Sequence, residues 1–231
     1  MKWREVTKVV LYTLLSNRGQ ISFVELLLLF VSYALLVFVM LPVHELAHAF
    51  AAYKLGDNTA YWNGRLRFNP LAHMDPIGTA MLVLFGIGYA RPVPINPRNF
   101  RNPKRDLALT ALAGPVSNVL MAALSIAVYR VLTFLPLSAT MSALAFFVFI
   151  QVLASVNIGL AVFNLLPIPP LDGSRILSLF LPDRYAYSLE RYSGYIRMGL
   201  LLFVFSGALD VPLDYLRNGL MTLLLKLFGF Y

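Results

Sequence analysis

Long apolar stretches separated by short polar segments dominate the pattern of this chain. Residues 21–40 are almost continuously apolar, and further apolar stretches cover residues 107–132 and 143–166. Each approaches or exceeds the ~20 residues that a helix needs to cross the hydrocarbon core of a bilayer. Residues 195–209 form a fourth stretch, and residues 213–231 fit an amphipathic tail or a short fifth span. The pattern therefore predicts an all-α membrane protein built as a polytopic helical bundle.

The first apolar stretch continues through Pro42 into VHELAHAFAAYKLG, which still favours helix to about residue 55. A helix of that length exceeds one span. We therefore expect it to tilt, to kink near Pro42 or to project from the membrane.

Three segments predict smaller elements between the spans. Residues 77–89 are apolar but too short to cross, and their three glycines favour a re-entrant or membrane-surface segment. Residues 64–68 form a possible short strand, and residues 90–96 are a second strand-like piece. Residues 90–106 carry five basic residues and four prolines, which exclude a continuous helix and indicate a basic loop.

Composition agrees with a membrane protein of one domain. The 231 residues are 59% hydrophobic and 13% charged, an apolar excess that a soluble domain of this size would not bury. We expect residues 1–20 to form an interfacial segment and residues 21–231 a single domain without repeats. The chain has no cysteine, which excludes disulfides and thiolate metal sites. Any metal must therefore bind histidines and carboxylates.

The net charge of +8 is explained by basic residues that flank the apolar stretches. They form no stripe interleaved with aromatic residues, so we expect no nucleic-acid partner. Placing the basic loop in the cytoplasm makes the first span run inward and brings residues 44 and 172 to the cytoplasmic side. The basic residues among positions 2–18 count against this orientation, and the side of the N-terminus stays open.

The sequence His44-Glu45-Leu46-Ala47-His48 is an HExxH motif on a predicted helix. Two histidines four residues apart lie on one helix face and can both bind a zinc ion, while Glu45 lies on the adjacent face as a general base. The alternative is a buried polar network that only packs helices. Burying three ionisable groups among apolar neighbours is costly, and such groups in membrane segments usually mark function.

Asp172 is the candidate third ligand. Zinc used for hydrolysis takes three protein ligands and leaves one position for water. Asp172 follows an apolar span at a point where Pro167, Pro169 and Pro170 must break the helix. Alone, Asp172 would be interpreted as a turn residue at a helix end, and the HExxH motif favours the metal interpretation. A fourth protein ligand would leave no place for water, so we expect His73 to have a structural role.

Several motifs in order resemble the site-2 proteases, intramembrane zinc metalloproteases, in their short prokaryotic branch without added domains. The resemblance runs from about Val43 to Asp183 and rests on HELAH, NPLAHMDPIGT, RPVPINPRNFRNP, AGPVSN and FNLLPIPPLDG. It implies that His44, His48 and Asp172 bind zinc, that Glu45 is the catalytic acid/base, and that Asn164 faces the substrate.

Asn164 precedes Asp172 by eight residues, about two helical turns, so both lie on a similar face before the proline break. Its amide is a candidate donor to an oxyanion or to an unwound substrate backbone, and an interhelical hydrogen bond is the alternative. We assign Asn118 of AGPVSN to helix packing, with Gly114 allowing close approach.

We therefore predict a zinc protease of the prokaryotic cell membrane that cuts single-span membrane proteins in or beside their transmembrane helices. Its active site faces the cytoplasm, and its oligomeric state is not defined by the sequence. A membrane zinc transporter or a non-catalytic metal-binding membrane protein is the alternative. A transporter repeats polar groups along a pathway, whereas here they concentrate at one depth.

Overall fold

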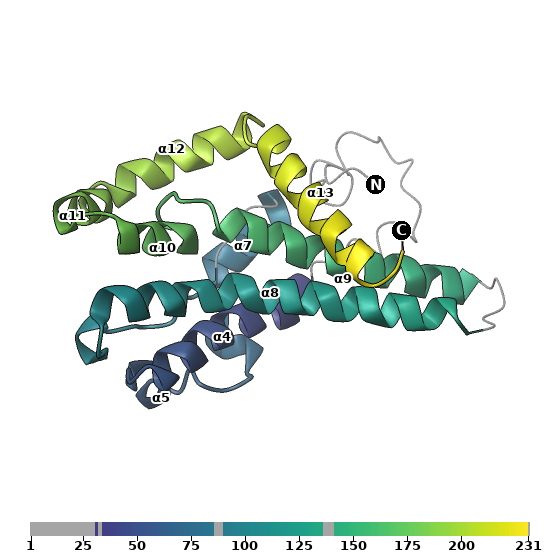
Figure 1. Cartoon of the computed structure of the whole chain (residues 1–231), viewed down its shortest axis with the longest axis horizontal. Coiled ribbons are helices and arrows are strands. Elements are labelled where there is room, and N and C mark those ends of the chain that lie inside the picture. The colour runs from purple at the N-terminus through teal and green to yellow at the C-terminus, as the bar shows by residue number, and fades with distance from the viewer. Residues whose placement is uncertain (1–30, 32–33, 86–89, 136–140, 231) are drawn as a thin grey trace.

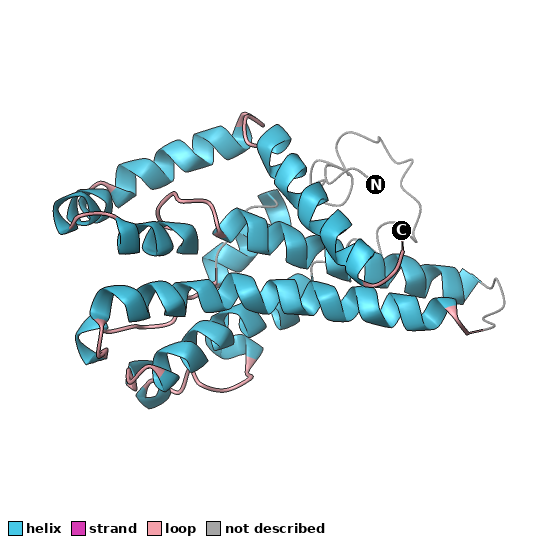
Figure 2. Ribbon diagram, in the orientation of Figure 1, coloured by secondary structure: helices cyan, strands magenta, loops and turns pink. Residues whose placement is uncertain are grey.

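The computed structural model describes residues 31, 34–85, 90–135 and 141–230. Within these ranges the regular elements are all helical, which confirms the predicted all-α fold (Figure 2). In chain order they are η1 (Leu36–Met40), α4 (Leu41–Lys54), α5 (Thr59–Trp62), α6 (Pro70–His73), α7 (Pro76–Phe85), η2 (Pro97–Asn99), α8 (Pro103–Thr133), α9 (Met141–Asn164), α10 (Asp172–Phe180), α11 (Asp183–Arg191), α12 (Ser193–Phe205) and α13 (Asp210–Leu227).

Three of the described helical segments are long and apolar enough to cross a membrane. They are Leu36–Lys54, Pro103–Thr133 and Phe146–Asn164. All three overlap spans predicted from the hydrophobic pattern, which supports an integral membrane protein. Helix α8 has 31 residues and is therefore about 46 Å long, so it extends past a hydrocarbon core of about 30 Å.

The irregularity expected near Pro42 is a π-helical turn. Residues Leu36–Met40 form η1, and Pro42 occupies the second position of α4 directly after it. Proline has no N–H to donate to the preceding turn, so it is tolerated at the start of a new helical segment. The chain thus stays helical through the motif while its hydrogen-bond pattern changes.

Helix α8 is the centre of the bundle. It packs along α9, with α4 against another of its faces, and α13 crosses α9 (Figure 1). The buried contact between α8 and α9 includes Ala122, Ile126, Ala154 and Ile158. Small residues at such contacts let membrane helices approach closely. Close packing is needed because lipid provides no hydrophobic drive for helix association. This packing fixes the segment before α8 and the segment after α9 relative to α4.

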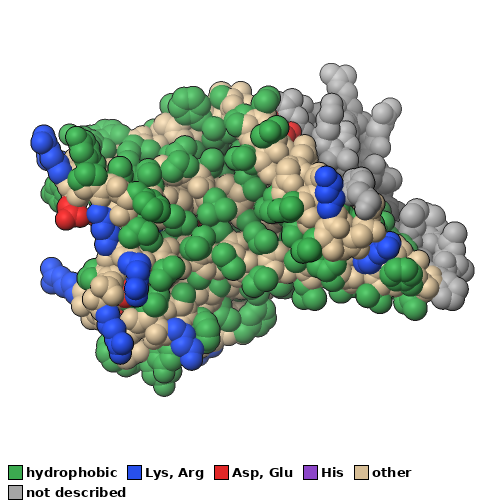
Figure 3. Space-filling view, viewed as in Figure 1, with side chains coloured by type: hydrophobic (Ala, Val, Ile, Leu, Met, Phe, Trp, Pro, Cys, Tyr) green, Lys and Arg blue, Asp and Glu red, His purple; other side chains and the backbone are tan. Residues whose placement is uncertain are grey.

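The outside of the bundle is apolar in the way that lipid contact requires. Large hydrophobic residues are exposed along α8 at helical spacing, among them Leu109, Leu112, Val116, Leu120 and Leu124. Figure 3 shows hydrophobic side chains over most of the visible face, with Lys and Arg gathered mainly at the end where α11 and the start of α8 lie. The distribution agrees with a membrane protein whose basic loops collect at one end.

Several sequence expectations differ from the structure or lie outside its described part. The predicted strands are not present, because residues 64–68 form a turn and bends and residues 90–96 have no regular structure. The segment predicted as re-entrant begins with α7, which ends at Phe85, and the interfacial segment 1–20 lies outside the described residues.

The apolar stretch at residues 195–209 and the C-terminal segment at residues 213–231 lie in two helices, α12 and α13. Helices α12 and α13 form one pair bent by 83°. The bend follows Gly207, whose φ of 74° is a conformation that glycine adopts without strain. Such a pair is a broken span or a re-entrant loop.

Candidate metal centre

Helix α4 places His44 and His48 one turn apart on the face that packs against α8. Both side chains are buried, with 5% and 6% of their surface exposed. Their rings meet edge to face with centroids 4.6 Å apart. The helical spacing of the motif therefore brings the two imidazoles together without any help from loops.

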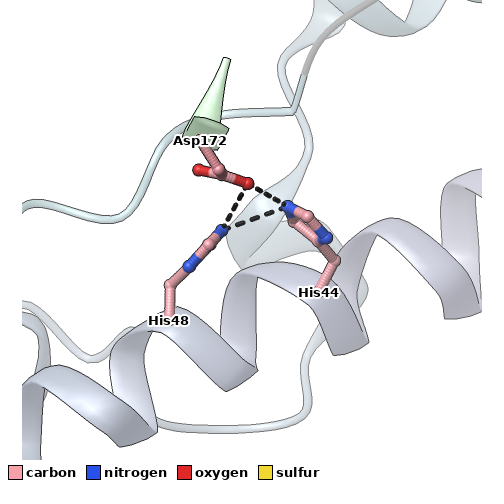
Figure 4. Close-up of side chains that lie close together, drawn as sticks. All are labelled: His44, His48 and Asp172. Carbon is pink, nitrogen blue, oxygen red and sulfur yellow. Dashed lines mark hydrogen bonds and ion pairs between the residues drawn. The ribbon is translucent and has the colours of Figure 1, made fainter. Parts of the chain in front are cut away.

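Asp172 reaches the two histidines from the other side of the site (Figure 4). Helix α9 ends at Asn164, the proline-rich residues 165–171 turn the chain, and Asp172 is the first residue of α10. Its Oδ2 lies 3.2 Å from His44 Nε2 and 3.3 Å from His48 Nε2. The structure thus brings the three ligands predicted from the sequence together.

Gly173 allows this approach of Asp172. A Cβ at position 173 would lie 2.2 Å from the carbonyl oxygen of Leu165 and 2.4 Å from that of Leu166. Such distances do not occur between real atoms, so a side chain would push α10 away from the end of α9. The glycine of LDG is therefore needed for close packing next to the ligand.

The outer nitrogens of the two imidazoles are held by acceptors on α8. His44 Nδ1 lies 2.9 Å from Asn118 Oδ1, and His48 Nδ1 lies 2.7 Å from the carbonyl oxygen of Thr110. Carbonyl oxygens only accept hydrogen bonds, so both Nδ1 atoms carry the proton. In the neutral rings both Nε2 atoms then have a free electron pair, and these atoms are only 3.1 Å apart.

The convergence of three electron-pair donors fits a metal ion. The two Nε2 atoms and Asp172 Oδ2 are separated by 3.1 to 3.3 Å, and Oδ2 is buried without a hydrogen-bond donor. Ligands at 2.0–2.1 Å from a tetrahedral zinc ion are about 3.3 Å from one another. Among the described residues, only His44, His48 and Asp172 form a group of three or more such side chains close enough to share an ion. Three ligands leave the fourth tetrahedral position for water.

Gly114 of α8 faces the metal side of both rings. A Cβ at this position would lie 2.4 Å from His48 Nε2 and 2.6 Å from His44 Cε1. Any side chain would therefore occupy the space that the ligands need. The sequence predicted that Gly114 lets another helix approach closely. The structure shows that the groups close to Gly114 are the side chains of His44 and His48.

Glu45 is half-buried beside the ligands and contacts the non-helical segment 91–96. The backbone N–H of Val93 donates to its Oε2 at 3.2 Å. Val93 itself is buried in a small apolar cluster with Ala49 and Ala60. The carboxylate is therefore tied at one oxygen to a segment that packs firmly against α4 and α5.

Asn164 and His73 do not join the group of ligands in this structure. Asn164 is the last residue of α9, and its Nδ2 donates to the carbonyl oxygen of Leu160. His73 is buried, and its Nε2 is 3.2 Å from the carbonyl oxygen of Arg67. Burial lowers the pKa of His73 and outweighs the hydrogen bond to Arg67, which raises it, while Arg65 and Glu45 have smaller opposing effects.

Two contacts of the site were missed from the sequence. Asn118 was assigned to helix packing, although a polar residue within a span is itself a signal of function. The other contact, the carbonyl oxygen of Thr110, has no sequence signal because every residue has a backbone carbonyl.

Comparisons with known proteins agree with this geometry. The model of Peptidase family M50 matches residues 134–206. The chain is 39% identical to a Bacillus subtilis protein named "Putative zinc metalloprotease YwhC" over 171 residues, which cover 72% of this chain and 75% of that protein. Proteins named "Putative zinc metalloprotease Rip2" are 34% identical in Mycolicibacterium smegmatis and 38% identical in Mycobacterium tuberculosis. Each of these matches covers 58% of this chain and 51% of the relative. No solved structure matches the chain.

Proposed function

The chain belongs to peptidase family M50, the site-2 proteases, and from this premise we propose that His44, His48 and Asp172 hold its zinc ion and that Glu45 is the catalytic acid/base. The protein is a zinc metalloprotease of the membrane. The observation that carries the residue assignment is the convergence of two imidazole nitrogens and one carboxylate oxygen within 3.3 Å of one another.

When bound at this site, zinc supplies Lewis-acid chemistry, which makes water a nucleophile near neutral pH and polarises the scissile carbonyl. The chain's own residues do the rest. Glu45 takes the proton of the attacking water and delivers it to the leaving amine. Its hydrogen bond with Val93 fixes one carboxylate oxygen and so limits the rotation of the group.

The polarity of the bundle supports a cytoplasmic active site. The C-terminal end of α4 and the start of α8 lie at one end of the bundle, and α9 runs toward that end (Figure 1). Basic side chains gather at this end, and cytoplasmic loops of membrane proteins are enriched in Lys and Arg. We therefore assign this end to the cytoplasm of a prokaryotic cell.

Membrane proteins with a single span are the substrates that we propose. A transmembrane helix must unwind before its peptide bonds can be attacked, because its carbonyls are engaged in hydrogen bonds. Residues 90–96 form a non-helical segment beside Glu45 along which an unwound chain can lie. Asn164, at the end of α9, is the proposed side-chain donor to the substrate, and such contact requires it to leave the carbonyl of Leu160.

The test compares native enzyme with Glu45→Gln during co-expression with a library of single-span membrane proteins. New termini should appear with native enzyme and be absent with Glu45→Gln, because an amide cannot accept the proton of water. Glu190→Gln, at an exposed position of α11, is the matched control and should cleave normally. Continued cleavage by Glu45→Gln would show that Glu45 is not the base.

Metal analysis of the same purified proteins tests the ligands. Native enzyme and Glu45→Gln should each hold about one zinc, whereas His48→Ala and Asp172→Ala should hold much less, since a hydrolytic site has only three protein ligands to lose. Full zinc retention in Asp172→Ala would remove Asp172 from the site.

A further inference from the structure

One peptide unit connects Glu45 to a buried arginine. The N–H of Val93 donates to Glu45 Oε2 at 3.2 Å, and the carbonyl oxygen of Pro92, at the other edge of the same peptide, accepts from Arg65 Nη2 at 2.9 Å. The N–H and C=O of a trans peptide point in opposite directions. Arg65 and Glu45 therefore lie at opposite edges of the Pro92–Val93 peptide.

Arg65 also holds the preceding residue of the segment. Its Nη2 is 2.7 Å from the carbonyl oxygen of Arg91. One guanidinium nitrogen thus binds two successive carbonyls and fixes the orientation of the peptide that follows them. This orientation determines where the Val93 N–H points, and it points at Glu45.

Arg65 is a buried cation without an ion-pair partner among the described residues. Only 6% of the residue is exposed, and none of the ion pairs between described residues includes it. Its Nη1 is buried without a hydrogen-bond partner. Burial and Arg91 lower the pKa of Arg65, while the opposite charge of Glu45 raises it. Burying a cation costs free energy that a neutral donor would avoid, so a loop clamp alone does not explain an arginine here.

Hydrogen bonds that do not involve Arg65 also hold residues 90–96 in place. His73 Nε2 donates to the carbonyl oxygen of Arg67, and the carbonyl oxygen of His73 accepts from the N–H of Arg91. Asp57 binds the N–H of Asn96 at the far end of the segment. The segment therefore keeps several anchors when Arg65 is replaced.

We propose that Arg65 is a positioning residue for the catalytic step, acting through the Pro92–Val93 peptide to hold the carboxylate of Glu45 beside the metal ligands. A cation at the carbonyl polarises the peptide and makes its N–H a stronger donor, because hydrogen bonds in a chain reinforce one another. The proposal rests on the proposed role of Glu45 as the acid/base. It assigns Arg65 an effect on turnover and none on zinc binding.

The test measures kcat, KM and zinc content for cleavage of a single-span substrate found in the co-expression experiment. Arg65→Met should lower kcat roughly 10- to 100-fold, within the range that general acid/base catalysis contributes, and leave KM and zinc content close to native. The kcat of Arg65→Lys should lie between those of native enzyme and Arg65→Met, because an ammonium keeps the charge but lacks the planar guanidinium. Arg184→Met, at an exposed position of α11, is the control and should have native kcat.

A second pair of variants tests whether the effect passes through the peptide. Val93→Pro removes the N–H that reaches Glu45, and Val93→Ala keeps it while also shortening the buried side chain. Val93→Pro should lower kcat well below that of Val93→Ala. Combining Val93→Pro with Arg65→Met should lower kcat no further than the stronger of the two single changes. Both remove the same link between Arg65 and Glu45.

Native kcat in Arg65→Met would overturn the proposal, as would a double variant in which the two losses multiply. Loss of zinc in parallel with loss of kcat would also overturn it, because Arg65 would then support the metal site as a whole. Failure of the proposed function is recognised separately, by cleavage in Glu45→Gln. Inactive Glu45→Gln together with fully active Arg65→Met would refute only the role of Arg65.

Discussion

His44 Nε2 lies 3.1 Å from His48 Nε2, and in neutral rings protonated at Nδ1 neither atom has a proton to donate to the other. Each imidazole donates a hydrogen bond from Nδ1 to an oxygen of α8, so the electron pairs of the two Nε2 atoms face each other across the site. This contact is repulsive unless a cation lies between the rings. Helix α8 therefore does more than pack against α4, because it fixes the protonation of both histidines.

Asn118 is expected to control zinc affinity through His44. Asn118→Leu removes the acceptor for the Nδ1 proton, so Nε2 is protonated part of the time and zinc binding should weaken 10- to 100-fold. Asn118→Asp keeps an acceptor oxygen at the same place and should bind zinc nearly as tightly as the native protein. Competition with a chelator on the purified proteins measures both. Equal affinities of the two variants would show that the hydrogen bond to His44 does not matter.

Gly114→Ala is expected to remove zinc from a protein that stays helical. The added Cβ would lie 2.4 Å from His48 Nε2 and would displace the ligand. Gly219→Ala in α13 is the control, since a Cβ there meets no atom within 4 Å. Both changes replace a helical glycine by alanine and gain up to ~1 kcal/mol of helix propensity, so their difference isolates the contact with the site. Metal analysis and circular dichroism should show normal zinc in Gly219→Ala and little in Gly114→Ala.

Asn164→Ala is expected to lower turnover roughly 10- to 1000-fold without loss of zinc if its amide stabilises an oxyanion. Asn157→Ala is the control, because Asn157, although more deeply buried, also donates to a carbonyl one turn earlier in α9, that of Leu153. Asn164 can donate to a substrate carbonyl only after its hydrogen bond to the carbonyl oxygen of Leu160 is broken. Equal rates for native enzyme and Asn164→Ala would leave Asn164 with a packing role.

The grouping of His44, His48 and Asp172 could be predicted because their placement depends on short-range rules. Two histidines four residues apart share a helix face whatever surrounds them, and three prolines end a helix wherever they occur. The predicted break is where α9 gives way to α10, and it places Asp172 at the site.

The strand predicted at residues 64–68 is absent because a contact with a distant segment determines the conformation of these residues. Its alternating polar and apolar residues fit a strand, but Gly64 adopts a φ of 66° and the side chain of Arg65 turns inward to bind two carbonyls of another segment. Such a contact joins residues 26 positions apart, and no local pattern contains it. The contacts of Asn118 and Thr110 with the histidines were missed for the same reason, since they span 74 and 62 positions.

Asp57 is expected to make the stability of the protein depend on acid pH. It is fully buried and accepts hydrogen bonds from Thr59, Asn96 and Asn99. Burial alone would raise the pKa of Asp57, but these hydrogen bonds outweigh burial and hold it below its ordinary value. A carboxyl with a lowered folded-state pKa stabilises the fold above the unfolded-state pKa of about 3.9, and this stabilisation is lost as the pH falls below it.

The difference in Tm between native protein and Asp57→Asn should therefore be large at pH 7 and should shrink below about pH 4. Comparing the two proteins at each pH cancels the titration of groups that both contain. Asp183→Asn, at an exposed position of α11, is the control and should follow the native protein. A Tm difference that is constant from pH 7 to pH 3 would contradict the assignment.

Cleavage is expected toward the cytoplasmic end of the substrate helix and should depend on helix-weakening residues near the scissile bond. The first expectation follows from geometry, because α4, which carries His48, and α9, which ends before Asp172, both run toward the basic end of the bundle. The second follows from energetics, since unwinding in lipid leaves backbone groups unpaired at several kcal/mol each, and Gly, Pro or Asn in the substrate lowers that cost. Replacing those residues by Leu should slow cleavage without abolishing binding. Mass spectrometry of the new termini locates the cut, and cuts clustered at the outer end would mean that the orientation is inverted.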